Sequence, residues 1–348
     1  MNKIRRVTIK QVAETANVSI QTVSRVLNNR PDVSPATRAT VLQVIDQLGY
    51  QPSNLARGLS SQRTYNIGVV IAGLDFTGPS KTLNGIAEAT EDLNYTLIIK
   101  ELHHFEYNVQ PVLNWLHARH VDGIIWAVPE YGNNREWLDE YLPQTPVPIV
   151  FHDMAARPDT SIVYMDNYAG AEKATRHLLH QGYRHIGHIS GSLGWYAAAQ
   201  RKQAWQDTLA ESGINFEERF WIAGDWSLAS GASVIAPLLD QFPEMEAVFI
   251  ANDQMAIGAL HTLCKRSIQV PQDLALVGYD DIPEVAYICP PLTTVRQEFY
   301  RYGYSSVSQL IELIEATRQE LNHIEHKFTR IEPELIIRES SVSSRRRR

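Results

Sequence analysis

Residues 8–28 read TIKQVAETANVSIQTVSRVLN, and this stretch decides how the amino-terminal part of the chain folds. It contains two short amphipathic patterns, and each follows a hydroxyl residue, Thr8 or Ser19, that can cap a helix. Between them, Asn17 tolerates the left-handed backbone that a tight corner requires. We therefore expect two short helices, each with one apolar face, joined by a turn of a few residues.

Gln21 and Arg25 lie four residues apart, on the side of the second predicted helix away from its apolar face. An amide and a guanidinium on one exposed helical face are the groups that read adenine and guanine edges in the major groove of DNA. An ordinary helical hairpin in another core would show the same short pattern. The stretch therefore favours a DNA-binding helix-turn-helix, with a plain hairpin as the alternative.

A third helical pattern follows, so residues 1–51 can form a small all-α domain. Ser34 can cap this helix, Pro35 suits its first turn, and Gly49 can end it. Residues 52–63 are too short and too rich in Gly and Ser to be stable as a free helix. We expect a hinge there that becomes helical only on binding.

The net charge of −7 is unevenly distributed along the chain. Residues 1–63 carry nine Lys and Arg against three Asp and Glu, a charge of +6, which leaves −13 for the remainder. A basic head on an acidic body is typical of a DNA-binding module attached to a ligand-binding or protein-binding domain. The Arg run at residues 345–348 is expected to belong to a disordered tail, residues 341–348.

Length and composition indicate a globular protein of two or three domains. No run of about 18 apolar residues is present, so no membrane span is expected. The basic residues at the start have no apolar segment behind them, which argues against a secretory signal. Two cysteines, Cys264 and Cys289, cannot form a disulfide framework, and a reducing cytoplasm fits.

From residue 64 the pattern changes to apolar strands that alternate with helical stretches of 12–18 residues. Such alternation predicts parallel sheets covered by helices on both faces. Two groups of four strands, with a break near residues 155–166, predict two doubly wound subdomains with a ligand cleft at the carboxyl ends of the strands. The eight expected strands lie at 65–73, 95–102, 121–128, 147–154, 185–191, 220–224, 247–253 and 274–281.

Several motifs resemble, in the same order, those of the LacI/GalR family of transcription repressors, and the nearest likeness is to its galactoside-responsive type. The matching pieces are VAETANVSIQTVSRVLN, VSPATR, NLARGL, IANDQMAIGAL and LALVGYDDIPEVAYICPPLTTVRQEF. The resemblance covers essentially the whole chain. It implies a body, residues 64–340, like that of periplasmic sugar-binding proteins, in which the chain crosses three times between subdomains. The first would comprise residues 64–164 with 294–325, and the second residues 165–293 with 326–340.

For DNA, the resemblance implies that Gln21 and Arg25 read bases and that Leu59 wedges into a central minor-groove step. Ile20 replaces a tyrosine of the galactoside-responsive type, so the operator sequence should differ. Hydroxyl and amide groups would contact phosphate, although Ser19 could equally be only a helix cap. The complete set of expected DNA-contacting residues is Thr8, Ser19, Ile20, Gln21, Thr22, Ser24, Arg25, Asn28, Thr37, Asn54, Ala56, Arg57 and Leu59.

For an effector, the resemblance implies a cleft that holds a neutral sugar. Sugar hydroxyls require planar bidentate groups, and the ring face requires an aromatic platform. The residues alone leave a turn-forming role open for Asn252 and Asp280, a solvated charge for Arg201, and a core or lid position for Trp226. The expected contacts are Asp153, Arg201, Trp226, Asn252, Asp280, Gln297 and Phe299.

The effector itself is open, because Ala72 and Thr82 replace a serine and an apolar residue of the galactoside-responsive type. A galactoside is the first expectation, with another glycoside, a purine or a nucleoside as alternatives. A sugar-binding protein without a regulatory role is a further alternative. The partners expected are pseudo-palindromic operator DNA, the sugar, and a second copy of the chain. A dimer is expected because the leucine-heptad tetramer tail of the galactoside-responsive type is not seen in this sequence.

No enzymatic chemistry is indicated, because the sequence contains no dinucleotide fingerprint, no P-loop and no nucleophile elbow. Three His-x-x-His pairs lack a third ligand at metal-site spacing. We therefore expect neither a metal nor a cofactor. The pairs are His117/His120, His177/His180 and His185/His188.

Overall fold

The computed structural model describes residues 7–27, 30–50, 63–104, 108–319 and 325–342 of the chain. These residues divide into two compact units, residues 1–65 and residues 66–348, which we call the head and the body. Each unit has its own hydrophobic core and is described by itself. Among the described residues, no helix is long and apolar enough to cross a membrane.

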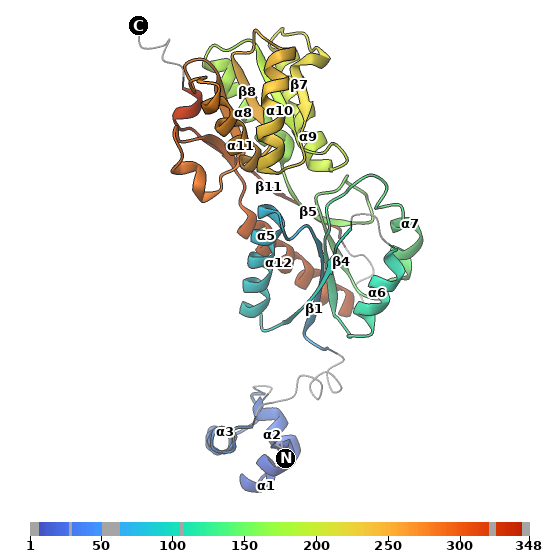
Figure 1. Ribbon diagram of the computed structural model, residues 1–348. Helices are drawn as coiled ribbons and strands as arrows, with labels where there is room; N and C mark the ends of the chain where they lie inside the picture. Colours follow the sequence, from blue (N-terminus) through green and yellow to red (C-terminus); the bar gives the residue numbers. More distant parts are fainter. Residues whose placement is uncertain (1–6, 28–29, 51–62, 105–107, 320–324, 343–348) are drawn as a thin grey trace, which may run out of the picture. The chain divides into compact units, whose positions relative to one another are not determined.

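The head is a three-helix domain made of α1 (Ile9–Thr15), α2 (Ile20–Leu27) and α3 (Pro35–Leu48) (Figure 1). Its core is formed by one face of each helix, with Val12, Val23 and Val41 fully buried. The turn between α1 and α2 places Asn17 at a φ of 51°, the left-handed conformation expected from the sequence. Gly49 ends α3 at a φ of 61°.

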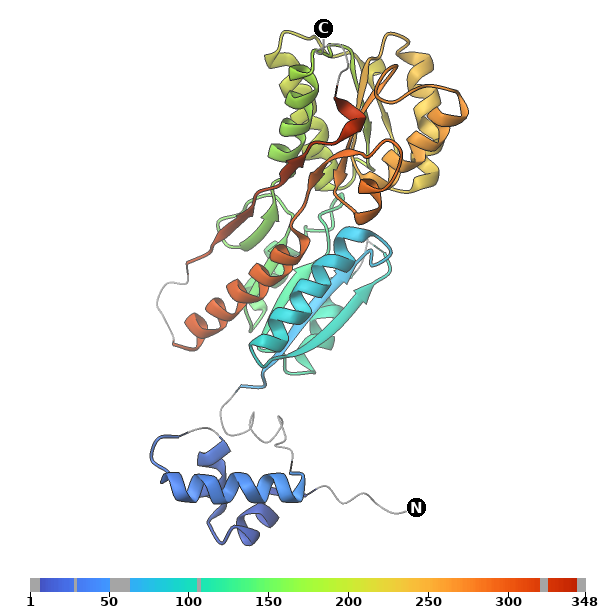
Figure 2. The same ribbon diagram turned by 90° about the vertical axis from the view of Figure 1, so that its left-hand side faces the viewer.

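The body contains a first sheet of six parallel strands in the order β11-β5-β4-β3-β1-β2. Helices α5 (Thr77–Asp92) and α12 (Phe299–Arg318) lie on one side of it, and α6 (Val109–His117) and α7 (Leu138–Tyr141) on the other (Figures 1 and 2). The strands are β1 (Asn66–Ala72), β2 (Thr96–Leu102), β3 (Gly123–Ala127), β4 (Ile149–His152), β5 (Ser161–Met165) and β11 (Phe328–Ile331).

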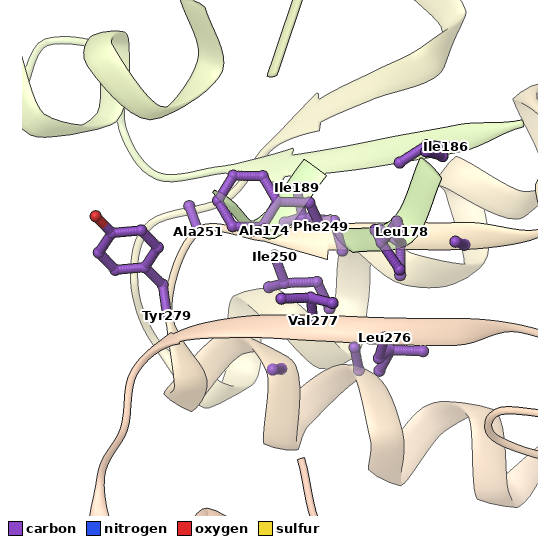
Figure 3. Packing of buried hydrophobic residues seen from close by; sticks show 14 of the residues in the cluster. Ala174, Leu178, Ile186, Ile189, Phe249, Ile250, Ala251, Leu276, Val277 and Tyr279 are labelled. Carbon is purple, nitrogen blue, oxygen red and sulfur yellow. The ribbon is translucent and has the colours of Figure 1, made fainter. Parts of the chain in front are cut away.

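The second sheet has the order β12-β10-β9-β8-β6-β7, and only β12 is antiparallel to its neighbour. Its central strands carry mainly buried apolar side chains, as Figure 3 shows for Ile189, Phe249 and Val277, because helices cover both faces. The strands are β6 (Ile186–Ser190), β7 (Trp221–Ala223), β8 (Ala247–Ile250), β9 (Ala275–Asp280), β10 (Thr293–Arg296) and β12 (Glu334–Ile336). The helices are α8 (Asn167–His180), α9 (Tyr196–Glu211), α10 (Leu228–Gln241) and α11 (Asp253–Lys265).

The fold class predicted from the sequence is confirmed. The expected break between two groups of strands at residues 155–166 is wrong, because strand β5 lies within that range. Two further boundaries also differ from those expected. β10 pairs with β9, so residues 294–296 belong to the second sheet; β11 pairs with β5, so residues 328–331 belong to the first. The chain therefore crosses between the sheets after β5, after β10 and between β11 and β12.

The expected disordered tail begins too early, because Ser341 is part of the folded body. A short 3₁₀ helix, Glu339–Ser341, ends the described chain, and Ser340 and Ser341 are fully buried there. The Ser341 hydroxyl bonds to Thr293 at 2.6 Å and to His177 at 2.8 Å. These bonds attach the segment to the second sheet. The remaining tail residues from 343 onward, including the Arg run, lie outside the described residues.

Candidate functional site

The start of the second head helix is fixed by a side-chain cap. The Ser19 hydroxyl accepts a hydrogen bond from the backbone N–H of Thr22 at 3.0 Å, and the two hydroxyls lie 2.9 Å apart. Ser19 therefore acts as a cap, and it is also exposed. Thr8 caps α1 in the same way, in a reciprocal capping box with Gln11.

The outer face of α2 presents the side chains expected to read bases. Gln21 and Arg25 are exposed, whereas Val23 and Val26 on the opposite face are buried. Arg25 lies 3.4 Å from Asp32, but both side chains are about half exposed, so this ion pair holds the guanidinium only weakly. Ile20 is 48% exposed, so its side chain is accessible at the start of α2.

The other expected DNA contacts divide into two groups. Thr22 and Ser24 are half-buried on α2, and Thr37 lies at the start of α3, where its N–H donates to the Ser34 hydroxyl at 3.2 Å. The remaining ones lie outside the described residues: Asn28, Asn54, Ala56, Arg57 and Leu59.

In the body, a cavity lies between the two sheets, and all seven residues expected to contact an effector line it. Each follows or ends a strand, or lies in a helix that follows one, because parallel strands present their carboxyl ends at one edge of a sheet. The first sheet's subdomain supplies Asp153 and Phe299, the second supplies Arg201, Trp226, Asn252 and Asp280, and Gln297 lies in the crossing after β10.

Arg201 is held rigidly at the base of this cavity. Its side chain is only 6% exposed; Nε donates to Asn167 Oδ1 at 2.9 Å, and Nη1 donates to the carbonyl of Ala251. The guanidinium also lies 3.8 Å from the centre of the Tyr279 ring. These contacts leave Nη2 to serve a ligand, and they explain why Arg201 is not a solvated helix charge.

Two buried carboxyl groups face Arg201. Burial raises the pKa of Asp280 to about 6, although Arg201, 4.0 Å away, and a hydrogen bond from Gln297 Nε2 at 2.6 Å oppose the rise. Burial also raises the pKa of Asp153 to about 6, opposed by the N–H of Met165 at 3.0 Å. Both acceptors are desolvated, so a hydroxyl donor from a ligand would relieve them.

Trp226 supplies an apolar wall and an unused donor. Only 8% of the residue is exposed, and its indole N–H has no hydrogen-bond partner among the described residues. A Cβ added at Gly191 would lie 2.1 Å from the Trp226 ring, so the ring can occupy this position only because residue 191 has no side chain. Trp226 therefore brings both an apolar ring and an unpaired donor to the lining of the cavity.

Three residues with a positive backbone φ line the same cavity. Asp153, Trp226 and Asp280 have φ values of 34°, 76° and 115°, and each such conformation costs about 1–3 kcal/mol. Strain of this kind persists where surrounding contacts impose it, typically at ligand sites. Asn252 is different: its side chain caps α11 through the N–H of Met255 and donates to the carbonyl of Trp226, both at 2.9 Å.

Several other residues that line the cavity were not expected from the sequence. Glu130 lies in the loop after β3 and His152 ends β4, so the carboxyl-end rule could have found both. Burial lowers the pKa of His152 to about 3, and its Nε2 lies 2.7 Å from the Ser306 hydroxyl. The aromatic residues that also line the cavity carried no comparable signal: Phe76, Trp195, Tyr196 and Tyr302.

Two histidines of the pairs noted in the sequence make hydrogen bonds inside the body. His177 bonds to Ser341, and His188 Nδ1 lies 2.8 Å from the carbonyl of Phe249. Within the described ranges, no group of three or more His, Cys, Asp or Glu is placed to hold a metal ion.

Comparison with known proteins gives two family models that cover different parts of the chain. A model described as "Bacterial regulatory proteins, lacI family" matches residues 8–53, which include the three helices of the head. A model described as "Periplasmic binding protein-like domain" matches residues 175–341 of the body.

Relatives match over nearly the full length. Catabolite control protein A of Priestia megaterium is 32% identical over 85% of this chain and 89% of its own. HTH-type transcriptional repressor PurR of Haemophilus influenzae (strain PittEE) is 31% identical over 97% of this chain and 99% of its own. A solved Lac repressor dimer, bound to operator and the anti-inducer ONPF, superposes with a TM-score of 0.84 at 28% identity. The match covers 97% of this chain and 100% of that one. The chain therefore belongs to the lacI family of bacterial regulatory proteins and is a DNA-binding transcriptional repressor rather than an enzyme.

Proposed function

We propose that this repressor controls a sugar-utilisation operon and is released from its operator by a neutral glycoside, with a galactoside as the first candidate. The observation that carries the proposal is the cavity itself. Convergent polar groups and aromatic walls from both sheets meet there, as a ligand that is both hydroxylated and ring-shaped requires.

The charges at the cavity favour a neutral ligand over a phosphorylated one. Carboxyl groups of Glu130, Asp153 and Asp280 line the cavity together with a single guanidinium, that of Arg201. The Asp280 carboxylate and the Ala251 carbonyl already neutralise or accept from part of that guanidinium. A phosphate would meet more negative than positive charge in a desolvated site, which is unfavourable.

The hydrogen-bonding groups suit neighbouring sugar hydroxyls. A hydroxyl both donates and accepts, so it can donate to Asp153 or Asp280 while it accepts from the Arg201 Nη2 or the Trp226 indole. Trp226 and Phe299 provide the apolar surface for the face of the ring. A purine or nucleoside offers fewer paired hydroxyls, so it is the second candidate.

On the DNA side, we propose that Gln21 and Arg25 read base edges and that Ile20 gives the operator its own sequence. The repressor would act as a homodimer on half-sites about one helical turn apart. The relative in the solved complex with operator is a dimer, which supports this assembly. Residues 52–63 would fold in the minor groove at the operator's centre, so their ordering is part of the operator affinity.

Effector binding would act through the cleft between the two sheets. The chain crosses between the two sheets three times, so a change in the cleft would alter the position of one sheet relative to the other. The first sheet is the one that follows the hinge in the chain. The ligand can shift the equilibrium only by its differential affinity for the two states, typically about 1–3 kcal/mol. We therefore expect about 5- to 150-fold weaker operator binding at saturating effector.

The test is a gel shift on the DNA upstream of neighbouring sugar-utilisation genes, with a panel of galactosides, other glycosides, sugar phosphates and purines. We expect a discrete complex that a neutral glycoside dissociates. Release by a sugar phosphate or a purine would refute the proposed effector class. A ligand that strengthens the complex would make the protein a corepressor-dependent regulator instead. Absence of any complex with these DNA fragments would refute the proposed operon.

A further inference from the structure

Besides the three chain crossings, a pair of loops connects the two sheets at the effector cavity. The loop after β3 contributes Glu130, Tyr131 and Gly132, and the loop after β6 contributes Gly194, Trp195 and Tyr196. Tyr131 and Trp195 form an isolated antiparallel bridge. On either side of it, the N–H of Gly132 donates to the Gly194 carbonyl at 3.1 Å, and the N–H of Tyr196 donates to the Glu130 carbonyl at 3.0 Å. We call these two loops the clasp.

The clasp is shaped for close contact at one position, Gly194. A Cβ added there would lie 2.3 Å from Tyr131 Cε2, and the three nearest atoms all belong to the Tyr131 ring. Gly194 does not have a positive φ, so its backbone alone does not require glycine. The close approach of the tyrosine ring is therefore what excludes a side chain.

The first loop is held in shape by its own side chains. Asn134 accepts a hydrogen bond from the N–H of Tyr131 at 3.1 Å and donates to the carbonyl of Pro129 at 2.9 Å. Arg135, which is 7% exposed, donates to the carbonyl of Val128. Glu130 Oε2 accepts from the N–H of Ala155 at 2.8 Å. A loop ordered by this many bonds can present its backbone to a partner loop at little further entropic cost.

Three residues of the clasp, Glu130, Trp195 and Tyr196, also line the effector cavity. Trp195 reaches across to Phe76 of the first subdomain, with ring centres 5.7 Å apart, and to Trp226, at 5.9 Å. The bridge therefore lies directly against the space where a ligand would sit. Separating the two sheets at this side requires both backbone hydrogen bonds to break.

We propose that the clasp is a gate on this side of the cavity, which holds the two sheets together in the absence of ligand and opens to admit or release a molecule. This inference rests on the proposed function only for the identity of the ligand that passes the clasp. Opening costs the two backbone bonds and the aromatic contacts, so the clasp sets the rate of entry and biases the unliganded body toward its closed state.

The test measures access to the cavity without any effector. Thr82 lines the cavity and is 3% exposed, so Thr82→Cys introduces a thiol that reagents reach only from inside. In that background Cys264 and Cys289, both exposed, are replaced by Ser. The rate of reaction with dithionitrobenzoate is then compared between chains that differ only at the clasp. Gly194→Ala is expected to accelerate the reaction about 5- to 100-fold, as loss of one or two backbone hydrogen bonds would.

Two further variants make the result specific. The double change Gly194→Ala with Tyr131→Ala removes the ring that the new methyl group meets, so the slow rate should return. Leu193→Ala, at an exposed neighbouring position in the same loop, should leave the rate unchanged. Equal rates for Gly194→Ala and its parent would overturn the proposal, as would an equal acceleration by Leu193→Ala. An unchanged rate would refute the gate but not the proposed effector class. An effector of another class would refute the proposed effector but not the gate.

Should Gly194→Ala fail to fold, hydrogen exchange in the unaltered protein decides the matter. The amides of Gly132 and Tyr196 donate the two clasp bonds and should exchange more slowly than the amide of Leu193. Unprotected amides at both positions would refute the gate.

Discussion

Replacing Asp280 by Asn should stabilise the body at neutral pH while it abolishes the response to effector. Asp280 is 12% exposed, and burial raises its pKa from 3.8 to about 6. Because a tenfold change in the acid constant corresponds to about 1.4 kcal/mol, the ionised carboxylate costs the folded body about 3 kcal/mol. Asn has no charge to desolvate and retains an acceptor for the Gln297 amide.

The pH dependence follows from the direction of the shift. With a raised pKa in the folded state, Asp280 costs nothing below about pH 3.8, where it is neutral in both states. The cost grows as pH rises and is complete above about pH 6. The variant should therefore be more stable than the parent by about 3 kcal/mol at pH 7.5, and equal to it near pH 4.

Urea denaturation followed by tryptophan fluorescence measures this difference, since all seven tryptophans lie in the body. Asp281→Asn is the matched control with the opposite sign. Asp281 bonds to Arg296 at 2.8 Å and to Arg338 at 2.7 Å, so its loss removes the carboxylate partner of Arg338, leaves Arg296 with Glu334 alone, and should destabilise the body. If Asp280→Asn destabilised the body at pH 7.5, the carboxylate would be a net stabilising group and the reasoning would be refuted.

Three other expectations concern the head and the cavity. Gln21→Ala or Arg25→Ala should relax operator specificity at one base position by about 1–3 kcal/mol, measured on operators with single substitutions; an equal loss on every sequence would make them phosphate contacts. Gly191→Ala should displace the Trp226 ring and weaken effector binding at least tenfold in calorimetry without loss of operator affinity; an unchanged affinity would remove that ring from the site. Gly49→Ala, at a φ of 61°, should lower the stability of the isolated head by about 1 kcal/mol in thermal unfolding, and no loss would mean that the left-handed cap is unimportant.

Local signals in the sequence were sufficient for the head. Caps, helical spacing and the corner at Asn17 are properties of residues close together in the chain, and each predicted helix is present. The strand ends were predictable for the same reason, and they placed Asn252 and Asp280 at an edge where ligands bind. The full set of seven residues at one cavity was expected only from the resemblance to the LacI/GalR family. The roles of these residues were harder to predict from the sequence. Asn252, for example, is a helix cap as well as a cavity residue.

Long-range pairing could not be predicted from local patterns. β5 and β11 are short strands, five and four residues long, whose pairing joins Ile162 to Phe328 across the sequence. Neither strand has the long apolar run that identifies a central strand, and β11 is exposed at two of its four positions. The clasp was invisible for a related reason, since its bonds involve only backbone atoms of two loops.

The central claim is that the cavity around Arg201 senses the effector that releases DNA. The most direct measurement is the operator affinity of Arg201→Lys, by fluorescence anisotropy, with and without the glycoside that dissociates the parent complex. Arg301→Lys, at an exposed position away from the cavity, is the control. We predict that Arg201→Lys binds operator within about threefold of the parent and is no longer released, because lysine keeps the charge but loses the guanidinium fork. A variant that the glycoside still releases as the parent is released would contradict the account.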